Sequence, residues 1–181
     1  MAENLIKGLQ ELGMPSVQIH FEFTARTRPD SSGCDAVRFL FTANKQMPLQ
    51  DVAQTASGGE IARVMLTLKA LIAQKRNLPT IIFDEIDTGV SGTMAERMGR
   101  VMQRMGQSAQ VLCITHLPQI AALGKVHFWV HKQENDTGTT SNIRALSADE
   151  RVQEIANMLS GAAITEAALT NARQLLDEGA Q

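Results

Sequence analysis

The chain has 181 residues, 44% of them apolar and 20% charged, with a net charge of −2, which is ordinary for one globular domain and excludes a broad basic surface for nucleic acid. Its two cysteines, Cys34 and Cys113, lie far apart in the sequence, which excludes a disulfide framework or a cysteine metal site and fits a reducing cytoplasm. No apolar run is long enough to cross a membrane and the N-terminus lacks the apolar core of a signal peptide, so no membrane partner is expected.

The first 55 residues predict a short helix followed by a β-hairpin. Leucine and isoleucine recur at helical spacing before Gly13 and Pro15, which end the helix. Apolar and polar residues then alternate, as in a half-buried strand, and a second strand follows a polar loop. The expected elements are a helix over 3–12, strands over 17–23 and 36–44, a loop over 26–35 between them and a linker over 45–55.

The middle of the chain alternates helices with short apolar strands. The first helix carries an apolar stripe made of Ile61, Val64, Met65, Leu68, Leu71 and Ile72. Both strands are apolar on both faces, which predicts buried strands in a parallel sheet whose ligands gather at the carboxyl ends. The expected elements are helices over 59–76, 94–105 and 117–123 and strands over 80–87 and 110–116; the methionines of 94–105 are expected to be core.

The last part of the chain predicts a second hairpin and two helices. Strands over 127–133 and 139–146 flank the turn-forming residues 134–138, and two helices after residue 148 are separated at 160–163. The fold class expected for the whole chain is α/β: a parallel sheet with flanking helices, an N-terminal hairpin, and a C-terminal hairpin with helices.

Three acidic residues follow the first apolar strand: Asp84, Glu85 and Asp87. Carboxylates at the end of a buried strand are costly unless they are paired, hydrogen-bonded or close to a cation, although one acid alone would most simply cap the next loop. Asp84 and Glu85 are adjacent, so their side chains point opposite ways. One could hold Mg²⁺ through water while the other orients a nucleophilic water, which is the division of labour in metal-assisted phosphoryl transfer.

The second strand ends at Thr115 and His116. A lone histidine is usually structural. Because parallel strands end at the same edge of a sheet, His116 is nevertheless expected close to the acidic residues, where it could hydrogen-bond a terminal phosphate.

The long helix opens with Ser57, Gly58, Gly59 and Glu60. Ser57 and Glu60 have the spacing of a capping box, in which each side chain satisfies a backbone N–H of the other residue. The same helix end offers unpaired N–H groups and a partial positive charge, and glycine lets an anion approach the backbone. These four residues alone favour the capping box over phosphate binding.

Taken in chain order, the motifs resemble the second half of an ABC-type ATPase head, in the branch shared by the SMC proteins and their DNA-repair relatives. The resemblance rests on "ASGGEIARVMLTLKAL", "IIFDEIDTGVSG" and "VLCITHLPQIAAL", and it extends from about Leu12 to the tail. The lead-in "GCDAVRFLFTANKQMPLQDVAQTASGGE" also fits a bacterial DNA-repair family of this branch. Ala62 stands where that family usually has serine, a small departure because Ser57 is retained.

The resemblance implies a role for each candidate residue. Asp84 resembles the Walker B acid that holds Mg²⁺ through water, Glu85 the catalytic base and His116 the catalytic switch histidine. The residues implied to bind ATP are Ser57, Gly58, Gly59 and Glu60 of the signature motif and Asp87 of the D-loop.

No phosphate-binding P-loop, G-x-x-x-x-G-K-[ST], occurs in the chain, so Asp84 and Glu85 have no nucleotide of their own to act on. The resemblance implies that an N-terminal half of the same protein supplies the P-loop, and that two heads form a homodimer around ATP and Mg²⁺. The full-length protein would act on DNA double-strand breaks in the cytoplasm, at the nucleoid. The chain alone is expected to be inactive.

The same resemblance divides the single domain into four parts. These are the end of a returning coiled coil over 1–14, the first hairpin and linker over 15–55, the motif core over 56–123, and the second hairpin and last helices over 124–181.

Three other interpretations stay open. The chain could be a non-catalytic α/β interaction module, or a Mg²⁺-dependent nuclease that uses Asp84, Glu85 and Asp87. It could also be a segment of a recombination-mediator ATPase of the same superfamily. The segment "THLPQIAAL" favours the DNA-repair family over that last possibility.

Overall fold

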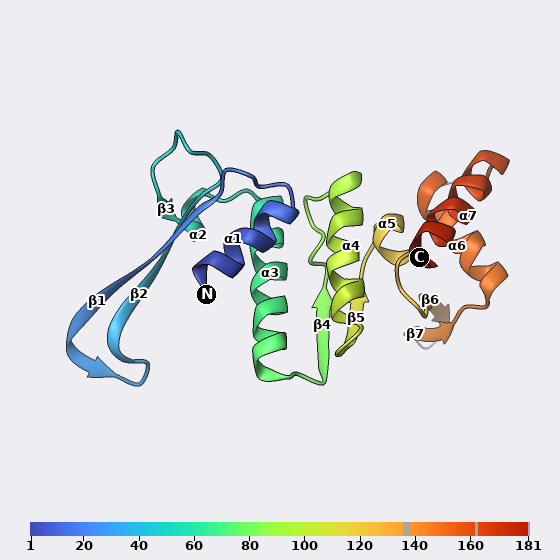
Figure 1. The fold of residues 1–181 in the computed structure, drawn as a ribbon. Helices are drawn as coiled ribbons and strands as arrows, with labels where there is room; N and C mark the ends of the chain where they lie inside the picture. The colour runs from blue at the N-terminus through green and yellow to red at the C-terminus, as the bar shows by residue number, and fades with distance from the viewer. Residues whose placement is uncertain (136–137, 162, 181) are drawn as a thin grey trace.

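The computed structural model describes residues 1–135, 138–161 and 163–180. Figure 1 shows the elements in a row, from the first hairpin at one end to the last helices at the other. The helices are α1 (Ala2–Glu11), α2 (Val52–Thr55), α3 (Gly58–Arg76), α4 (Thr93–Met105), α5 (Pro118–Ala121), α6 (Ala148–Ser160) and α7 (Glu166–Ala180). The strands are β1 (Gln18–Asp30), β2 (Gly33–Thr42), β3 (Gln50–Asp51), β4 (Thr80–Asp84), β5 (Gln110–Ile114), β6 (Phe128–Asn135) and β7 (Gly138–Ala145). None of the helices in these ranges has the length and apolar character needed to span a membrane.

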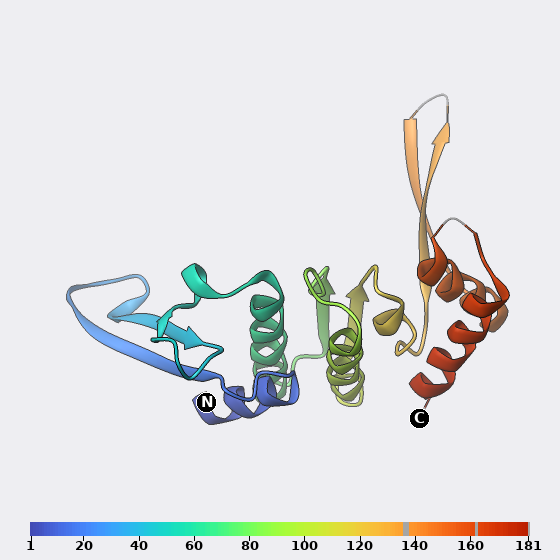
Figure 2. The ribbon, with the colours of Figure 1, turned by 90° about the horizontal axis from the view of Figure 1, so that it is seen from above.

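A parallel pair of strands, β4 and β5, forms the centre of the chain, as predicted. One face of the pair packs against α3 and α4 (Figure 2), with Phe83 of β4 fully buried among Leu66 of α3 and Met98 and Met102 of α4. The prediction that the methionines of α4 are core is therefore confirmed for Met98 and Met102.

The opposite face of the β4–β5 pair is uncovered, so the expectation that both faces are buried was wrong. Ile82 is 57% exposed, Leu112 40% and Ile114 55%. Side chains alternate along a strand, which puts these three on the face away from Phe83. No element in the described part of the chain covers this face. Apolar residues on both faces of a strand are typical of a sheet that is covered by another layer on each face.

The predicted apolar stripe of α3 was only partly correct. Ile61, Met65 and Ile72 are 39%, 42% and 45% exposed. The helix instead buries Leu66 toward β4, and Val64 toward α1 and the first hairpin. Because α3 lies between two clusters of buried side chains, it is covered on two sides, and a single stripe does not describe it.

The first hairpin is longer than predicted, because most of the expected loop over 26–35 belongs to β1 and β2. The turn is confined to the two serines between the strands. The Asp30 carboxylate accepts hydrogen bonds from the Ser32 backbone N–H (2.8 Å) and hydroxyl (2.6 Å), which closes this turn. A register shift between Ala25 and Asp30 accommodates the irregular segment. The expected linker over 45–55 also carries the short elements β3 and α2.

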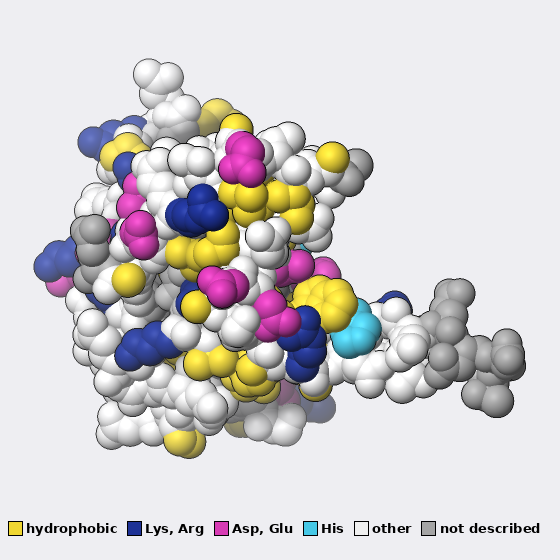
Figure 3. Space-filling model, turned by 90° about the vertical axis from the view of Figure 1, so that its right-hand side faces the viewer, with side chains coloured by type: hydrophobic (Ala, Val, Ile, Leu, Met, Phe, Trp, Pro, Cys, Tyr) yellow, Lys and Arg dark blue, Asp and Glu magenta, His cyan; other side chains and the backbone are white. Residues whose placement is uncertain are grey.

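The second hairpin and the two last helices are present as predicted. Figures 2 and 3 show that the β6–β7 hairpin reaches well beyond the rest of the chain. Of the turn predicted over 134–138, residues 136–137 lie outside the described residues. Helix α6 ends at Gly161, whose φ of 73° suits glycine, and the rest of the predicted break includes residue 162, which is also outside them.

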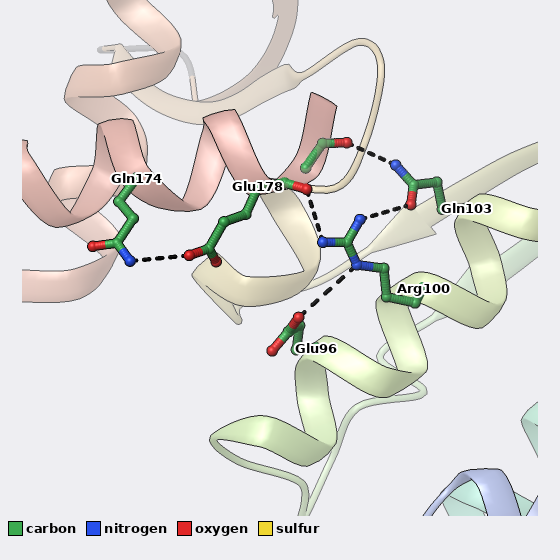
Figure 4. A network of polar contacts seen from close by, with 6 residues as sticks. Glu96, Arg100, Gln103, Gln174 and Glu178 are labelled. Atoms are coloured by element: carbon green, nitrogen blue, oxygen red, sulfur yellow. Dashed lines mark hydrogen bonds and ion pairs between the residues drawn. The ribbon is translucent and has the colours of Figure 1, made fainter. Parts of the chain in front are cut away.

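Polar side chains of α4 hold the end of α7 (Figure 4). Arg100 donates to the carbonyl oxygen of Glu178 at 2.7 Å, and the Gln103 amide donates to that of Gly179 at 2.7 Å. These carbonyls have no partner within the helix, so the contacts satisfy them and fix α7 against α4.

Candidate functional site

The carboxyl end of the β4–β5 pair brings the predicted acids together with the end of β5. Asp84 is paired with Ile114 in the parallel register, and the Glu85 backbone N–H donates to the Ile114 carbonyl at 3.1 Å. Asp84 and Glu85 are both exposed. Asp84 shares the uncovered face with Ile82, since the two are separated by one residue on the strand.

Glu85 has a left-handed backbone conformation, with φ of 46°. This conformation costs a non-glycine residue about 1–3 kcal/mol and is concentrated at functional sites. The turn that follows fixes it, because the Thr88 backbone N–H (3.3 Å) and hydroxyl (2.9 Å) both donate to the Glu85 carbonyl. The side chain of Glu85 therefore leaves the chain in a direction that a continuing strand would not give it.

Asp87 differs from the other two acids because it is fully buried. Its Oδ2 accepts a hydrogen bond from the Thr115 hydroxyl, and the same hydroxyl accepts one from the Leu117 backbone N–H at 3.0 Å. Its Oδ1 lies 3.9 Å from Nδ1 of His116, whose side chain is 66% exposed. The structure therefore brings Asp87 and His116 together, as their positions at neighbouring strand ends predicted.

The charge of Asp87 also reaches Cys113 on β5. Burial, and then the negative charge of Asp87, raise the pKa of the Cys113 thiol to about 12. The thiol is therefore neutral at physiological pH and unsuited to nucleophilic or metal-binding chemistry.

The helix end at Ser57 forms the predicted capping box. The Ser57 hydroxyl oxygen accepts from the Glu60 backbone N–H at 3.4 Å, and the Glu60 carboxylate accepts from the Ser57 backbone N–H at 2.8 Å. Ser57 and Gly58 are exposed, so this end of α3 is open to solvent. A helix end of this kind favours anions through its unpaired N–H groups and its dipole.

Two glycines bring this helix end into contact with the turn that follows β4. A Cβ on Gly59 would lie 2.7 Å from the carbonyl oxygen of Gly89, which follows the three acids. Figure 1 shows the start of α3 on the side toward which β4 and β5 point. The structure thus places Gly59 in contact with the turn after β4, while Ser57 and Gly58 stay exposed.

Arg63 is a residue of this region that sequence reasoning missed. Its Nε donates to the Gly59 carbonyl at 3.0 Å, and its Nη1 donates to the Leu12 carbonyl at 3.1 Å. One guanidinium therefore joins the glycine turn to the end of α1. No local pattern signals this role, because Leu12 lies 51 residues away in sequence.

The geometry limits what these residues can do alone. In the described ranges no three His, Cys, Asp or Glu side chains gather as a metal site, and Asp87 is buried against Thr115. Asp84 alone suits Mg²⁺ that keeps several waters and takes its other oxygens from phosphates, which is how this ion is usually held. A cavity of about 410 Å³ lies between the end of α1 and α4, and one of about 550 Å³ lies between α1, α3 and α4. None of the predicted site residues lines either cavity.

Proteins similar in sequence to the chain are DNA repair proteins named RecN. The chain is 40% identical over 171 residues to RecN of Vibrio cholerae, an alignment that covers 94% of the chain and 31% of that protein. It is 35% identical over 196 residues to RecN of Bacillus subtilis, an alignment that covers 100% of the chain and 34% of that protein. It is 40% identical over 176 residues to RecN of Deinococcus radiodurans, an alignment that covers 97% of the chain and 31% of that protein. The chain therefore spans about a third of the length of these relatives.

Solved structures with a similar fold are heads of SMC ATPases. A structure from work on the ATP-driven dimerization and DNA-stimulated activation of SMC ATPases matches with a TM-score of 0.62 and 17% identity, over 90% of this chain and 92% of that one. The Smc head domain with a coiled coil and joint from Pyrococcus yayanosii matches with a TM-score of 0.63 and 16% identity, over 99% of this chain and 29% of that one. No family model matches the chain. The structural matches confirm the predicted fold class.

Proposed function

Because this chain is a RecN-like segment with the fold of an SMC ATPase head, we propose that it forms part of the ATP-hydrolysing site of a longer DNA-repair protein. The observation that carries the proposal is that the ends of two parallel strands bring Asp84 and Glu85 beside Ile114 and bring Asp87 beside His116, with Gly59 of the open helix end against the turn that follows.

The proposed chemistry assigns one task to each side chain. Glu85 orients and deprotonates the attacking water, Asp84 holds Mg²⁺ through water, and His116 hydrogen-bonds the terminal phosphate of ATP. With Mg²⁺ bound, the ion would neutralise charge that develops on the phosphates. Asp87 lies in the proposed D-loop with its carboxylate turned inward, and nucleotide contact from this segment stays a prediction.

The phosphate cradle comes from an N-terminal P-loop half of the same protein. Two features support this partner: among the described residues β5 pairs only with β4, and the face carrying Ile82, Leu112 and Ile114 is exposed. A further parallel strand and its helix would complete the sheet and cover these side chains. Without that half, the chain should bind ATP weakly and hydrolyse none.

The helix end at Ser57 serves a second head. Ser57, Gly58 and Gly59 are proposed to meet the terminal phosphate of an ATP held by the partner copy, so that two heads enclose two ATP molecules. The capping box is compatible with this role, because it uses the N–H groups of Ser57 and Glu60 and leaves those of Gly58 and Gly59 available. ATP hydrolysis would then open the homodimer and change how the full-length protein holds DNA, in the cytoplasm at the nucleoid.

The nuclease interpretation loses support from the structure. A two-metal or clustered-acid site needs several carboxylates around one space, whereas Asp87 is buried and contacts Thr115. The described residues hold no group of three or more His, Cys, Asp or Glu side chains that could bind a metal ion.

The test is ATP hydrolysis by the full-length parent protein. Glu85→Gln should lower kcat by about 10²- to 10⁴-fold, as expected for loss of a general base, while ATP-dependent dimers persist in light scattering. Glu3→Gln, at an exposed position of α1, is the matched control and should leave kcat unchanged. Full activity of the Glu85→Gln protein would rule out the assignment.

A second substitution tests the signature role. Ser57→Arg should block ATP-dependent dimerisation while monomers still bind ATP, because the phosphate is held by the other copy. Loss of nucleotide binding by the Ser57→Arg monomer would contradict the assignment to the partner's ATP.

A further inference from the structure

The Asp87 carboxylate has two oxygens in different surroundings. Oδ2 accepts the hydrogen bond of the Thr115 hydroxyl, whereas Oδ1 is buried and has no hydrogen-bond partner among the described residues. Burying a carboxylate oxygen without a hydrogen-bond partner is costly, and native structures leave few such atoms. The position of Oδ1 therefore points to a group that pairs with it.

His116 is the group within reach. Its Nδ1 lies 3.9 Å from Oδ1, and its side chain is 66% exposed, so the ring has room to turn. A rotation that shortens this distance to about 2.8 Å would make a charge-assisted hydrogen bond.

The other titratable groups nearby do not compete for His116. In the described part of the chain, Asp87 is the one charged residue found in contact with the imidazole. Asp84 and Glu85, at the end of β4, make no hydrogen bond or ion pair with it, and the Cys113 thiol on β5 is neutral because its pKa is raised to about 12.

We propose that Asp87 is a positioning residue for His116: Oδ1 accepts the Nδ1–H of the imidazole while Oδ2 holds Thr115, so that Nε2 faces outward toward a phosphate oxygen. That Nε2 meets a phosphate oxygen depends on the proposed function, whereas the inferred Asp87–His116 hydrogen bond does not depend on it. Nε2 can donate to that oxygen while Nδ1–H is held by Asp87 only in the imidazolium form, in which both ring nitrogens carry a proton.

Backbone contacts hold the carboxylate in place for this role. The Val90 backbone N–H donates to the Asp87 carbonyl at 3.0 Å, and the Leu117 backbone N–H donates to the Thr115 hydroxyl oxygen at 3.0 Å. Asp87 thus ties the turn that follows Glu85 to the segment that carries His116. The proposed base Glu85 and the proposed switch histidine His116 would therefore be held at a fixed position relative to each other.

The protonation of the two His116 nitrogens tests the hydrogen bond directly. We would record ¹⁵N spectra of the 181-residue chain with labelled histidine at pH 7.5, assigning His116 by a His116→Gln variant. The expected wild-type spectrum shows a protonated Nδ1. Asp87→Asn presents an amide N–H to Nδ1 and should shift the ring to the Nε2–H tautomer, whereas Asp35→Asn on the first hairpin should change nothing. An unprotonated Nδ1 in the wild-type chain would overturn the inference. This outcome can be observed even if a variant fails to fold.

Kinetics of the full-length parent test the positioning role separately. Asp87→Asn should lower kcat about 10-fold or more with little change in KM for ATP, since the buried carboxylate contacts Thr115 and His116. Thr115→Val should act in the same direction and Thr115→Ser should restore kcat. Wild-type kcat in Asp87→Asn would contradict the positioning role. A parent without ATPase activity would instead contradict the proposed function, and the ¹⁵N result would still decide on the hydrogen bond.

Discussion

Gly59 and Gly89 lie in direct contact, although they belong to different motifs: a Cβ on Gly59 would come within 2.7 Å of the Gly89 carbonyl oxygen. Gly59 belongs to the helix end that is proposed to bind phosphate, and Gly89 to the turn after the acidic strand. Gly89 itself has a φ of 76°, a conformation that favours glycine. The close approach of two backbones therefore couples the two motifs.

Gly59→Ala should force this contact apart. We expect a loss of about 1–3 kcal/mol in the free energy of unfolding, the usual cost of inserting a methyl group where backbone must shift. Urea unfolding followed by circular dichroism measures it. Gly58→Ala is the matched control, because a Cβ there meets nothing within 4 Å. If the two variants had equal free energies of unfolding, the turn after β4 would be able to move away from the added methyl group without loss of stability.

The capping box at Ser57 should contribute to stability independently of any phosphate. Ser57→Ala removes the acceptor for the Glu60 N–H and should cost about 1 kcal/mol, whereas Ser57→Gly should cost only a few tenths. Ser147→Ala tests the same motif at the start of α6, where Ser147 and Glu150 form an equivalent box. Both alanine variants are compared with wild type by thermal unfolding. A neutral Ser57→Ala with a costly Ser147→Ala would mean that the cap at α3 is not formed in solution.

Local patterns predicted the parts of the site that depend on neighbouring residues. The capping box follows from the spacing of Ser57 and Glu60, and the meeting of Asp84 with the end of β5 follows from parallel pairing. Other features depend on distant segments, such as the Arg63 contact with the Leu12 carbonyl. The exposure of Ile82 does not follow from the composition of its strand, which is that of a strand buried on both faces, whereas no element in the described residues covers this face.

The left-handed conformation of Glu85 should lower the stability of the chain. Asparagine tolerates this conformation better than glutamate or alanine, so Glu85→Asn should unfold at higher urea than Glu85→Ala, with a difference of up to about 1 kcal/mol. Both variants remove the proposed base and should lose ATPase activity in the parent protein. Equal midpoints for the two variants would indicate that residue 85 is not held at positive φ.

The two cysteines should differ in reactivity with pH. The pKa of Cys113 is raised from 9.0 to about 12, so at pH 8 a maleimide should label exposed Cys34 and leave Cys113 largely unmodified. The folded chain holds the Cys113 proton more tightly than the unfolded chain does. The resulting stability is therefore complete below about pH 9 and is lost as pH rises toward 12. Mass spectrometry after timed labelling checks the reactivity, and rapid labelling of Cys113 at pH 8 in the folded chain would refute it.

Removal of the negative charge beside Cys113 supplies the control for that prediction. Asp87→Asn should lower the pKa of Cys113, because the Asp87 charge is the second cause of the shift, but burial should keep it above the ordinary thiol value. A labelling rate that does not change in Asp87→Asn would mean that the Asp87 charge does not reach the thiol.

The uncovered face of β4 and β5 should make the isolated chain self-associate. Ile82 and Ile114 lie on neighbouring strands with more than half of each side chain exposed, and adjacent exposed apolar residues promote contacts between copies. Ile82→Thr combined with Ile114→Thr keeps residues that favour strands and should shift the mass measured by chromatography with light scattering toward the monomer. Ile143→Thr on the second hairpin is the matched control, since that isoleucine is 67% exposed. If Ile143→Thr alone gave the same shift, the hairpin rather than the sheet would be the surface that drives association.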